Sequence, residues 1–201
     1  GELLDAVAGG EGFDLIQAFA GPLPVIVIAE MLGIDPADRA AFKRWSELDV
    51  RTFNAFLSDE DRASVISALG ERDAYLRRVL ARRRAEPRDD LLSALIAAEE
   101  AGDRLDDDEI VTMCELLLVA GNVTTTDLIG NGVWLLLRHS GELDKLRADP
   151  SLIGNAVEEI LRFESPVVQS VRIPTVDVAI RGCPMRRGES VVVFLAAANR
   201  D

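Results

Sequence analysis

The segment from about residue 109 to residue 138 constrains the fold most, because its apolar residues point in nearly every direction around a helix. They are Ile110, Met113, Leu116, Leu117, Leu118, Val119, Leu128, Ile129 and Trp134. A helix of roughly 30 residues rises about 45 Å, and one that is apolar on all sides is normally surrounded by other helices. Asp106 and Glu109 have the spacing of a capping box, which predicts where this helix begins. The sequence therefore predicts helices packed around a long central one.

Within this helix, residues 120–126 read Ala-Gly-Asn-Val-Thr-Thr-Thr, an unfavourable sequence for a buried helix. Glycine costs about 1 kcal/mol relative to alanine in a helix interior, and threonine is stiff at its first side-chain dihedral. Gly121 lacks a side chain and Thr124 can donate to the carbonyl of residue 120, which predicts a local kink or groove. The groove could hold a flat ligand and a small molecule. Alternatively, the small residues only let a neighbouring helix pack closely, with the hydroxyls bonded to their own backbone.

The helical pattern continues to about residue 165, where β-branched runs replace it. We expect a mainly α (α+β) fold in one incomplete domain, with a helical core over 1–165 and a β-rich segment over 166–201. The strands are predicted in "VVQSVRIPTVDVAI" and "SVVVFLAA", with the turn-rich "RGCPMRRGE" between them.

The helical core also contains a predicted helix at about 150–164, which carries the only Glu-x-x-Arg of the chain. Its Glu159 and Arg162 are spaced i, i+3 and so share one helix face. Most such pairs are exposed ion pairs with little effect on stability. Because strands are predicted directly after this helix, the sequence context of the pair differs from that of an ordinary exposed ion pair.

Charge and composition exclude several function classes. The chain has 22 Lys and Arg against 35 Asp and Glu, a net charge of -13, so its field repels nucleic acid and anionic membrane surfaces. Asn122, the threonines and Asp127 interrupt its best apolar stretch, which falls short of the roughly 18 residues of a membrane span. Cys114 and Cys183 match neither a disulfide framework nor a metal-binding spacing. We expect a cytoplasmic chain that binds neither nucleic acid nor membrane.

Several motifs, in this order and spacing, resemble the haem-thiolate monooxygenases, the cytochrome P-450 superfamily. They are "FAGPLPVIVIAEMLGIDPADRAAFKRW", "AGNVTTT", "EEILRFESPV", the arginine of "VRIPT", and "AAANRD". The first resembles the soluble bacterial branch in particular. The likeness covers essentially all 201 residues, roughly the middle half of a family member. It implies a partial P-450-like fold, in which the kinked central helix crosses over the haem.

The resemblance implies roles for individual residues. Thr124 matches the threonine that steers protons to iron-bound oxygen, and Gly121 matches the glycine beside the oxygen pocket. With Ala120, these two residues are expected to contact the haem. Arg172 matches the arginine that pairs with a haem propionate, a contact that suits its guanidinium group.

Two further groups of residues are implied by the same likeness. Glu159 and Arg162 match a buried structural pair that braces the haem-binding core, with a third partner expected downstream of this chain. Other positions match those that face an apolar substrate over the haem. They are Leu116, Val119, Ala120, Val167 and Val168.

The resemblance also implies cofactors and partners for the intact protein: haem b, dioxygen, an apolar small molecule, and a ferredoxin-type electron donor with its reductase. The implied function is oxidation of that molecule, for example by hydroxylation. A second interpretation from a different class is a helical domain without catalysis, which binds a small molecule or acts as a scaffold. Haem titration of the intact protein distinguishes the two.

The sequence departs from the family pattern in two places. Val123 stands where the family usually has an acidic residue before the key threonine, so Asn122, Thr125, Asp127 or the substrate would have to supply protons, or the enzyme would depend on peroxide. The cysteine that ligates the iron is expected downstream, and neither Cys114 nor Cys183 has its context. We therefore interpret the chain as an internal fragment that is inactive alone.

Overall fold

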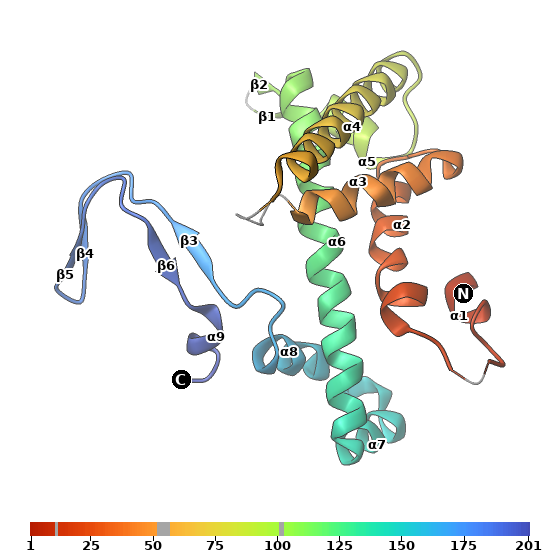
Figure 1. The fold of residues 1–201 in the computed structure, drawn as a ribbon, viewed down its shortest axis with the longest axis vertical. Helices are drawn as coiled ribbons and strands as arrows, with labels where there is room; N and C mark the ends of the chain where they lie inside the picture. The colour runs from red at the N-terminus through yellow and green to blue at the C-terminus, as the bar shows by residue number, and fades with distance from the viewer. Residues whose placement is uncertain (11, 52–56, 101–102) are drawn as a thin grey trace. The chain divides into compact units, whose positions relative to one another are not determined.

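The computed structural model describes residues 1–10, 12–51, 57–100 and 103–201, and it divides the chain into two compact units, 1–126 and 127–201. Most of the described residues are helical, which confirms the predicted mainly α fold (Figure 1). None of the helices in this part of the chain is both long and apolar enough to cross a membrane. The predicted division into a helical core and a β-rich segment stays a prediction.

Unit 1 is almost entirely helical, with one short hairpin. Its elements are α1 (Glu2–Asp5), the π-helix η1 (Ile16–Ala20), α2 (Pro22–Met31), the 3-10 helix η2 (Pro36–Asp38), α3 (Arg39–Arg51), α4 (Asp59–Ala85), α5 (Leu91–Ala97), the antiparallel strands β1 (Glu99–Glu100) and β2 (Asp103–Arg104), and the first part of α6 (Asp107–Arg138). The long helix predicted at about 109–138 is confirmed as α6.

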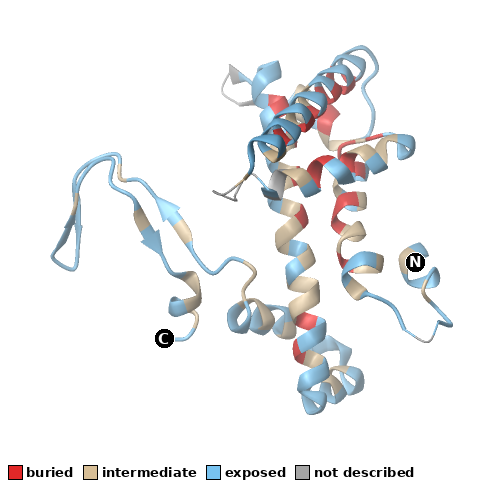
Figure 2. Cartoon of the chain, in the orientation of Figure 1, coloured by how far each residue is buried: buried red, intermediate tan, exposed pale blue. Residues whose placement is uncertain are grey.

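A continuous apolar core holds α2, α3, α4, α5 and α6 of unit 1 together (Figure 2). Phe42 and Leu80 are almost completely buried, as is Leu118 of α6. Phe42 packs edge-on against Trp45, with ring centroids 6.4 Å apart, and Trp45 lies 5.3 Å from Tyr75 of α4. Burying large side chains from several helices supplies the main stabilising free energy of such a unit.

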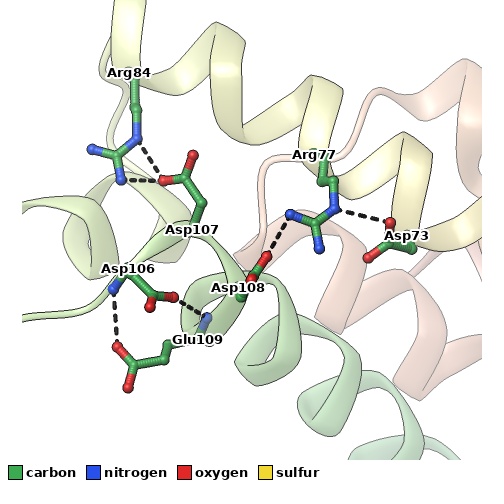
Figure 3. Close-up of polar contacts among 7 residues, drawn as sticks. All are labelled: Asp73, Arg77, Arg84, Asp106, Asp107, Asp108 and Glu109. Carbon is green, nitrogen blue, oxygen red and sulfur yellow. Dashed lines mark hydrogen bonds and ion pairs between the residues drawn. The ribbon is translucent and has the colours of Figure 1, made fainter.

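The start of α6 has the predicted capping box (Figure 3). The Asp106 backbone N–H donates to Glu109 Oε2 at 2.9 Å, and the Glu109 N–H donates to Asp106 Oδ1 at 2.8 Å. Two of the backbone donors that a helix start leaves unpaired are thereby satisfied. The capping box therefore fixes the residue at which the long helix begins.

Ion pairs join this end of α6 to α4 (Figure 3). Arg77 donates to Asp108 at 2.7 Å and to Asp73 of its own helix at 2.9 Å, and Arg84 Nε donates to Asp107 at 3.0 Å. All five side chains are exposed, so each pair contributes little free energy alone. Together they align the acidic first turn of α6 with the arginines of α4.

A buried ion pair connects three helix ends of unit 1. Arg83 of α4 donates to the carboxylate of Asp90 at 2.5 Å and to the carbonyl of Gly33 at 2.6 Å, and both charged side chains are 5% exposed. Asp90 also caps α5 by accepting from the Ser93 N–H at 2.8 Å. Gly33 has a φ of 66°, and a Cβ there would lie 2.1 Å from the Asp90 carboxylate. Only glycine fits this junction.

Unit 2 consists of helices followed by two separate strand pairs. Its elements are the second part of α6, α7 (Ser140–Ala148), the 3-10 helix η3 (Pro150–Leu152), α8 (Ile153–Phe163), β3 (Ser170–Arg172), β4 (Val178–Ile180), β5 (Cys183–Met185), β6 (Val191–Val193) and α9 (Leu195–Ala198). Strand β3 pairs with β6 and β4 pairs with β5, both antiparallel. The helix predicted at about 150–164 is observed as η3 and α8.

Two local predictions in unit 2 were wrong. The turn between β4 and β5 consists of Arg181 and Gly182, both at positive φ, so Cys183 lies in a strand paired with Ile180 rather than in a turn. Leu195–Ala198 forms α9 instead of continuing a strand. Leucine and alanine favour helix strongly, and this preference wins where the β3–β6 pairing ends.

Candidate active site

The first part of α6 has two different faces. One is a buried stripe of Ile110, Val111, Cys114, Leu118 and Asn122. Leu116, 58% exposed, and Ala120, also exposed, lie about half a turn away from that stripe. Leu116 and Ala120 were predicted to face substrate, and they form an open, apolar surface on α6. Val119, predicted with them, is partly buried.

Thr124 makes the predicted hydrogen bond. Its hydroxyl donates to the carbonyl of Ala120 at 2.6 Å, and α6 nevertheless continues as an α-helix to Arg138. The bond uses the hydroxyl proton and leaves the oxygen lone pairs able to accept. The hydroxyl therefore lies beside the open apolar surface as a neutral group that can accept a hydrogen bond and, on rotation, donate one.

Gly121 allows a close approach between helices. A Cβ at this position would lie 2.9 Å from Cδ1 of Ile28 on α2. Nearby, the Thr126 hydroxyl donates to the carbonyl of Ala20 at 3.1 Å. Both elements of the packing interpretation are thus observed, since a glycine admits a neighbour and Thr124 bonds its own backbone. They leave the surface of Leu116 and Ala120 uncovered, so they do not exclude chemistry there.

Val123 replaces the usual acidic residue, and several nearby residues were considered as the proton source instead. One of them, Asn122, already makes a hydrogen bond to another helix. The amide of Asn122 is 6% exposed and donates to the Ser46 hydroxyl of α3. Thr125 and Asp127 are exposed, and Asp127 belongs to unit 2. Val123 itself is partly buried and has no ionisable group.

Glu159 and Arg162 of α8 form the predicted pair in a bidentate geometry. Arg162 Nε donates to Glu159 Oε2 and its terminal nitrogen to Oε1, both at 2.7 Å, while its other terminal nitrogen donates to the Asn199 carbonyl at 2.8 Å. The hydrogen bond between the two side chains lowers the pKa of Glu159 and raises the pKa of Arg162. The pair thus connects α8 to the turn after α9.

The expected burial of this pair is not observed. The side chains of Arg162 and Glu159 are 45% and 60% exposed. The described residues of unit 2 cover only part of α8, so water still reaches both charges. In this chain the pair therefore acts as an exposed connection and not as a buried network.

The remaining predicted positions of unit 2 are also exposed. Arg172 of β3 donates to the Ser170 hydroxyl and, at 2.9 Å, to the Val171 carbonyl, both through the same terminal nitrogen. Its guanidinium group has further donors that could bind an anion. Val167 and Val168 are 40% and 54% exposed.

Sequence reasoning missed some residues that organise unit 2. Arg200 donates to the carbonyl of Phe163 at 2.6 Å and stacks on its ring at 4.6 Å, and Asn131 of α6 donates to the carbonyl of Glu164 at 3.1 Å. Both bonds satisfy backbone acceptors at or just beyond the end of α8. The sequence contained no local signal for either bond, because both join residues more than 30 positions apart.

The chain's cysteines lack the properties of an iron ligand. Burial, with a smaller contribution from Glu115, raises the pKa of the Cys114 thiol to about 11, so the thiolate that binds metals is disfavoured. Cys183 is exposed in β5. Among the residues that the structure describes, no group of three His, Cys, Asp or Glu side chains could hold a metal ion.

An apolar cavity of about 380 Å³ lies in unit 2 between the end of α6, α7 and α8. Leu135, Leu146, Ile160 and Phe163 contribute to its apolar wall. A Glu142–Lys145 ion pair of 2.8 Å lies among its lining residues. The volume is at the lower end of the range found for small-molecule sites.

Within each unit, the residues present fit a haem. In unit 1, the open apolar surface of Leu116 and the small Ala120 on α6 suits a flat macrocycle. Thr124 has a hydroxyl beside the same surface. In unit 2, taken by itself, Arg172 has further donors that could bind a carboxylate.

Comparisons with known proteins agree with this geometry. The family model described as Cytochrome P450 matches residues 39–201. The chain is similar to cytochrome P450 CYP107DY1 of Priestia megaterium, with 40% identity over 100% of this chain and 48% of the relative. It is also 45% identical to the vitamin D(3) 25-hydroxylase of Pseudonocardia autotrophica, over 94% of this chain and 45% of that protein.

A solved structure extends the likeness to the fold. The complex of CYP109E1 from Bacillus megaterium with testosterone has a TM-score of 0.92 and 36% identity, and the match covers 100% of this chain and 54% of that one. The chain thus spans about half the length of the relatives it matches.

Proposed function

This chain belongs to the cytochrome P450 family, and on that basis we propose that the whole protein is a haem-dependent monooxygenase that oxidises an apolar small molecule. The observation that carries the proposal is the Thr124 hydroxyl, held on the Ala120 carbonyl beside an open apolar surface. One relative named as a vitamin D(3) 25-hydroxylase and one solved relative with bound testosterone support a substrate of sterol size.

Haem b, when bound, would supply the iron that activates dioxygen, so that one oxygen atom would enter the substrate and the other would leave as water after uptake of two electrons and two protons. The proposal assigns the following roles to residues of this chain. Leu116 and Ala120 would pack against the bound cofactor or substrate and exclude water there, and Arg172 would hold a carboxylate of the cofactor. Glu159 and Arg162 brace the segment that follows them.

Thr124 is the proposed proton-handling group. Because the preceding residue Val123 has no ionisable group, the Thr124 hydroxyl would receive its proton from Thr125, Asp127, water or the substrate and pass it on. The electrons would come from a ferredoxin-type donor and its reductase in the cytoplasm. The acidic net charge of -13 does not decide that contact, because docking depends on the local surface.

The test uses the full-length protein. Titration with haem should give tight binding and a thiolate-type spectrum of the carbonyl complex. With testosterone as a probe substrate, Thr124→Ala should lower the product formed per reduced cofactor by about tenfold or more, because general acid–base groups contribute about 10²–10⁴-fold. Thr112→Val, at an exposed site on the same helix, is the matched control.

A second candidate function is a helical small-molecule-binding domain without catalysis. The apolar cavity between α6, α7 and α8 favours it. Full-length protein that takes up no haem, yet binds an apolar probe with an affinity that Ile160→Glu abolishes, would support this alternative and overturn the monooxygenase proposal.

A further inference from the structure

Asn122 interrupts an otherwise apolar buried stripe. Ile110, Cys114 and Leu118 precede it at helical spacing on the same face of α6, and all are 2% exposed or less. Asn122 is 6% exposed, so an amide occupies the next position of this buried face. An apolar residue would continue the pattern at lower cost, because a buried amide must find hydrogen-bond partners.

The amide has a partner for only one of its two polar atoms. Nδ2 donates to the hydroxyl of Ser46 on α3, which is 1% exposed and lies 76 positions away in the sequence. Oδ1 is buried and has no hydrogen-bond partner among the described residues. A half-satisfied buried amide is less stable than an apolar contact of the same size. Stability therefore does not explain this pair.

The pair lies next to the turn of α6 that carries Thr124. On either side of Asn122, Gly121 packs on Ile28 of α2 and Thr126 bonds to the carbonyl of Ala20. Three consecutive contacts thus fix this part of α6 against α2, α3 and η1. Two of these contacts are hydrogen bonds, which have a preferred direction, and the bond to Ser46 is the one that joins two buried side chains.

We propose that Asn122 and Ser46 are positioning residues, whose hydrogen bond fixes the rotation of α6 relative to α3 and thereby the place of Thr124 on the open surface. Apolar packing alone tolerates small rotations, since it has no preferred direction. A single directed bond between two buried side chains removes that freedom. The inference deepens the proposed function and rests on it for the role of Thr124.

The test is amide hydrogen exchange in the full-length, haem-loaded protein. Asn122→Leu and Ser46→Ala should each raise the exchange rate of residues 118–126 at least threefold. The double variant should show no more than either single variant, since each already removes the bond. Thr112→Val should leave the exchange rate of this segment unchanged. The unfolding midpoint of Asn122→Leu should stay equal to the parent's or rise.

A spectroscopic measurement on the same variants separates positioning from a purely structural role. Absorbance titration with 4-phenylimidazole, a nitrogen ligand of haem iron, should show at least a threefold change in affinity in both single variants and the same change in the double. Additive effects, or unchanged exchange and affinity, would overturn the proposal. So would a lowered midpoint with faster exchange throughout unit 1, which marks a structural pair. A parent protein that binds no haem would instead refute the proposed function, and the same exchange comparison on the haem-free full-length protein would still test whether the bond fixes α6.

Discussion

The two units of this chain are stabilised in different ways. Unit 1 buries a cluster of apolar residues from five helices, whereas Leu135 is the one apolar side chain of residues 127–201 that is buried. Unit 2 relies on backbone pairing and on bonds such as Arg162 to Asn199 and Arg200 to Phe163. It also leaves Ile173 and Ile180 more than 60% exposed. The same chain therefore contains a region with its own core and a region without one.

Two ion pairs make the difference measurable. Arg83–Asp90 in unit 1 is 5% exposed on both sides, and Glu159–Arg162 in unit 2 is 60% and 45% exposed, although both have short contacts of 2.5 and 2.7 Å. Contact distance is thus a poor guide to the effect of an ion pair. The environment decides, because losing one partner leaves an unpaired charge in the interior but only a hydrated charge at the surface.

The largest effect is expected from Arg83→Met. The substitution leaves the Asp90 carboxylate buried without its cation and the Gly33 carbonyl without its donor. We expect a loss of about 3–5 kcal/mol in the free energy of unfolding, measured by urea denaturation of the chain. Arg162→Met is the matched control and should change the midpoint far less. Equal losses in the two variants would refute the contrast between the units.

The next effect compares two leucines on long helices. Leu80 of α4 is 2% exposed and Leu137 of α6 is 69% exposed. Leu80→Ala should cost about 3 kcal/mol, because it removes packed methylene groups and leaves a cavity, while Leu137→Ala should cost about 0.5 kcal/mol or less. Urea unfolding measures both. A large loss for Leu137→Ala would show that unit 2 has a core that its exposure does not indicate.

Acid should weaken unit 1 through Asp90. Burial alone would raise its pKa, but hydrogen bonds from Ser93 and Arg83 and the Arg83 charge lower it on balance. Because the folded pKa lies below the unfolded value of about 3.9, the carboxylate's stabilising contribution is complete above that pH and is lost as the pH falls through the folded pKa. Unfolding midpoints measured down to pH 3 should therefore fall more steeply for the parent than for Asp90→Asn.

The same experiment has a control in unit 2. Glu159 also has a lowered pKa, from its hydrogen bond with Arg162, but it is 60% exposed. Glu159→Gln should therefore leave the acid dependence close to that of the parent. If Glu159→Gln reduces the pH dependence of the unfolding midpoint as much as Asp90→Asn does, the exposed pair stabilises the fold more than its exposure predicts.

The helices and their starts could be predicted from the sequence because their signals are local. The capping box at Asp106 and Glu109 and the bond from Thr124 to residue 120 depend only on spacing along one helix. The same holds for the approach of Glu159 to Arg162. Local patterns therefore gave the elements that carry the candidate site.

What the sequence could not give depends on contacts between distant segments. Nothing in the sequence near Asn122 indicates Ser46, and Arg83 gives no sign of the carbonyl at Gly33, 50 positions away. Gly121 was predicted from the family to lie beside oxygen, but its observed contact is Ile28, and its role in catalysis stays a prediction. The exposure of Arg162 in this chain could not be read from the sequence either, because burial depends on which segments cover a helix, and the buried role implied by the family stays a prediction.

The smallest expected effect concerns the open face of α6 and the missing acid. Val123→Glu places a carboxyl group next to Thr124, where the parent residue has no ionisable group. If proton supply limits the parent, the full-length enzyme should form about threefold more product per reduced cofactor, equal to about 0.6 kcal/mol at the transition state. Val133→Glu, on the same helix but in unit 2 and 36% exposed, adds the same charge without that neighbour and should change nothing.

Equal yields from Val123→Glu and the parent would mean that a nearby side chain, water or substrate already delivers the proton to Thr124. Equal gains from both variants would show a general charge effect, and the chemistry could then not be assigned to unit 1.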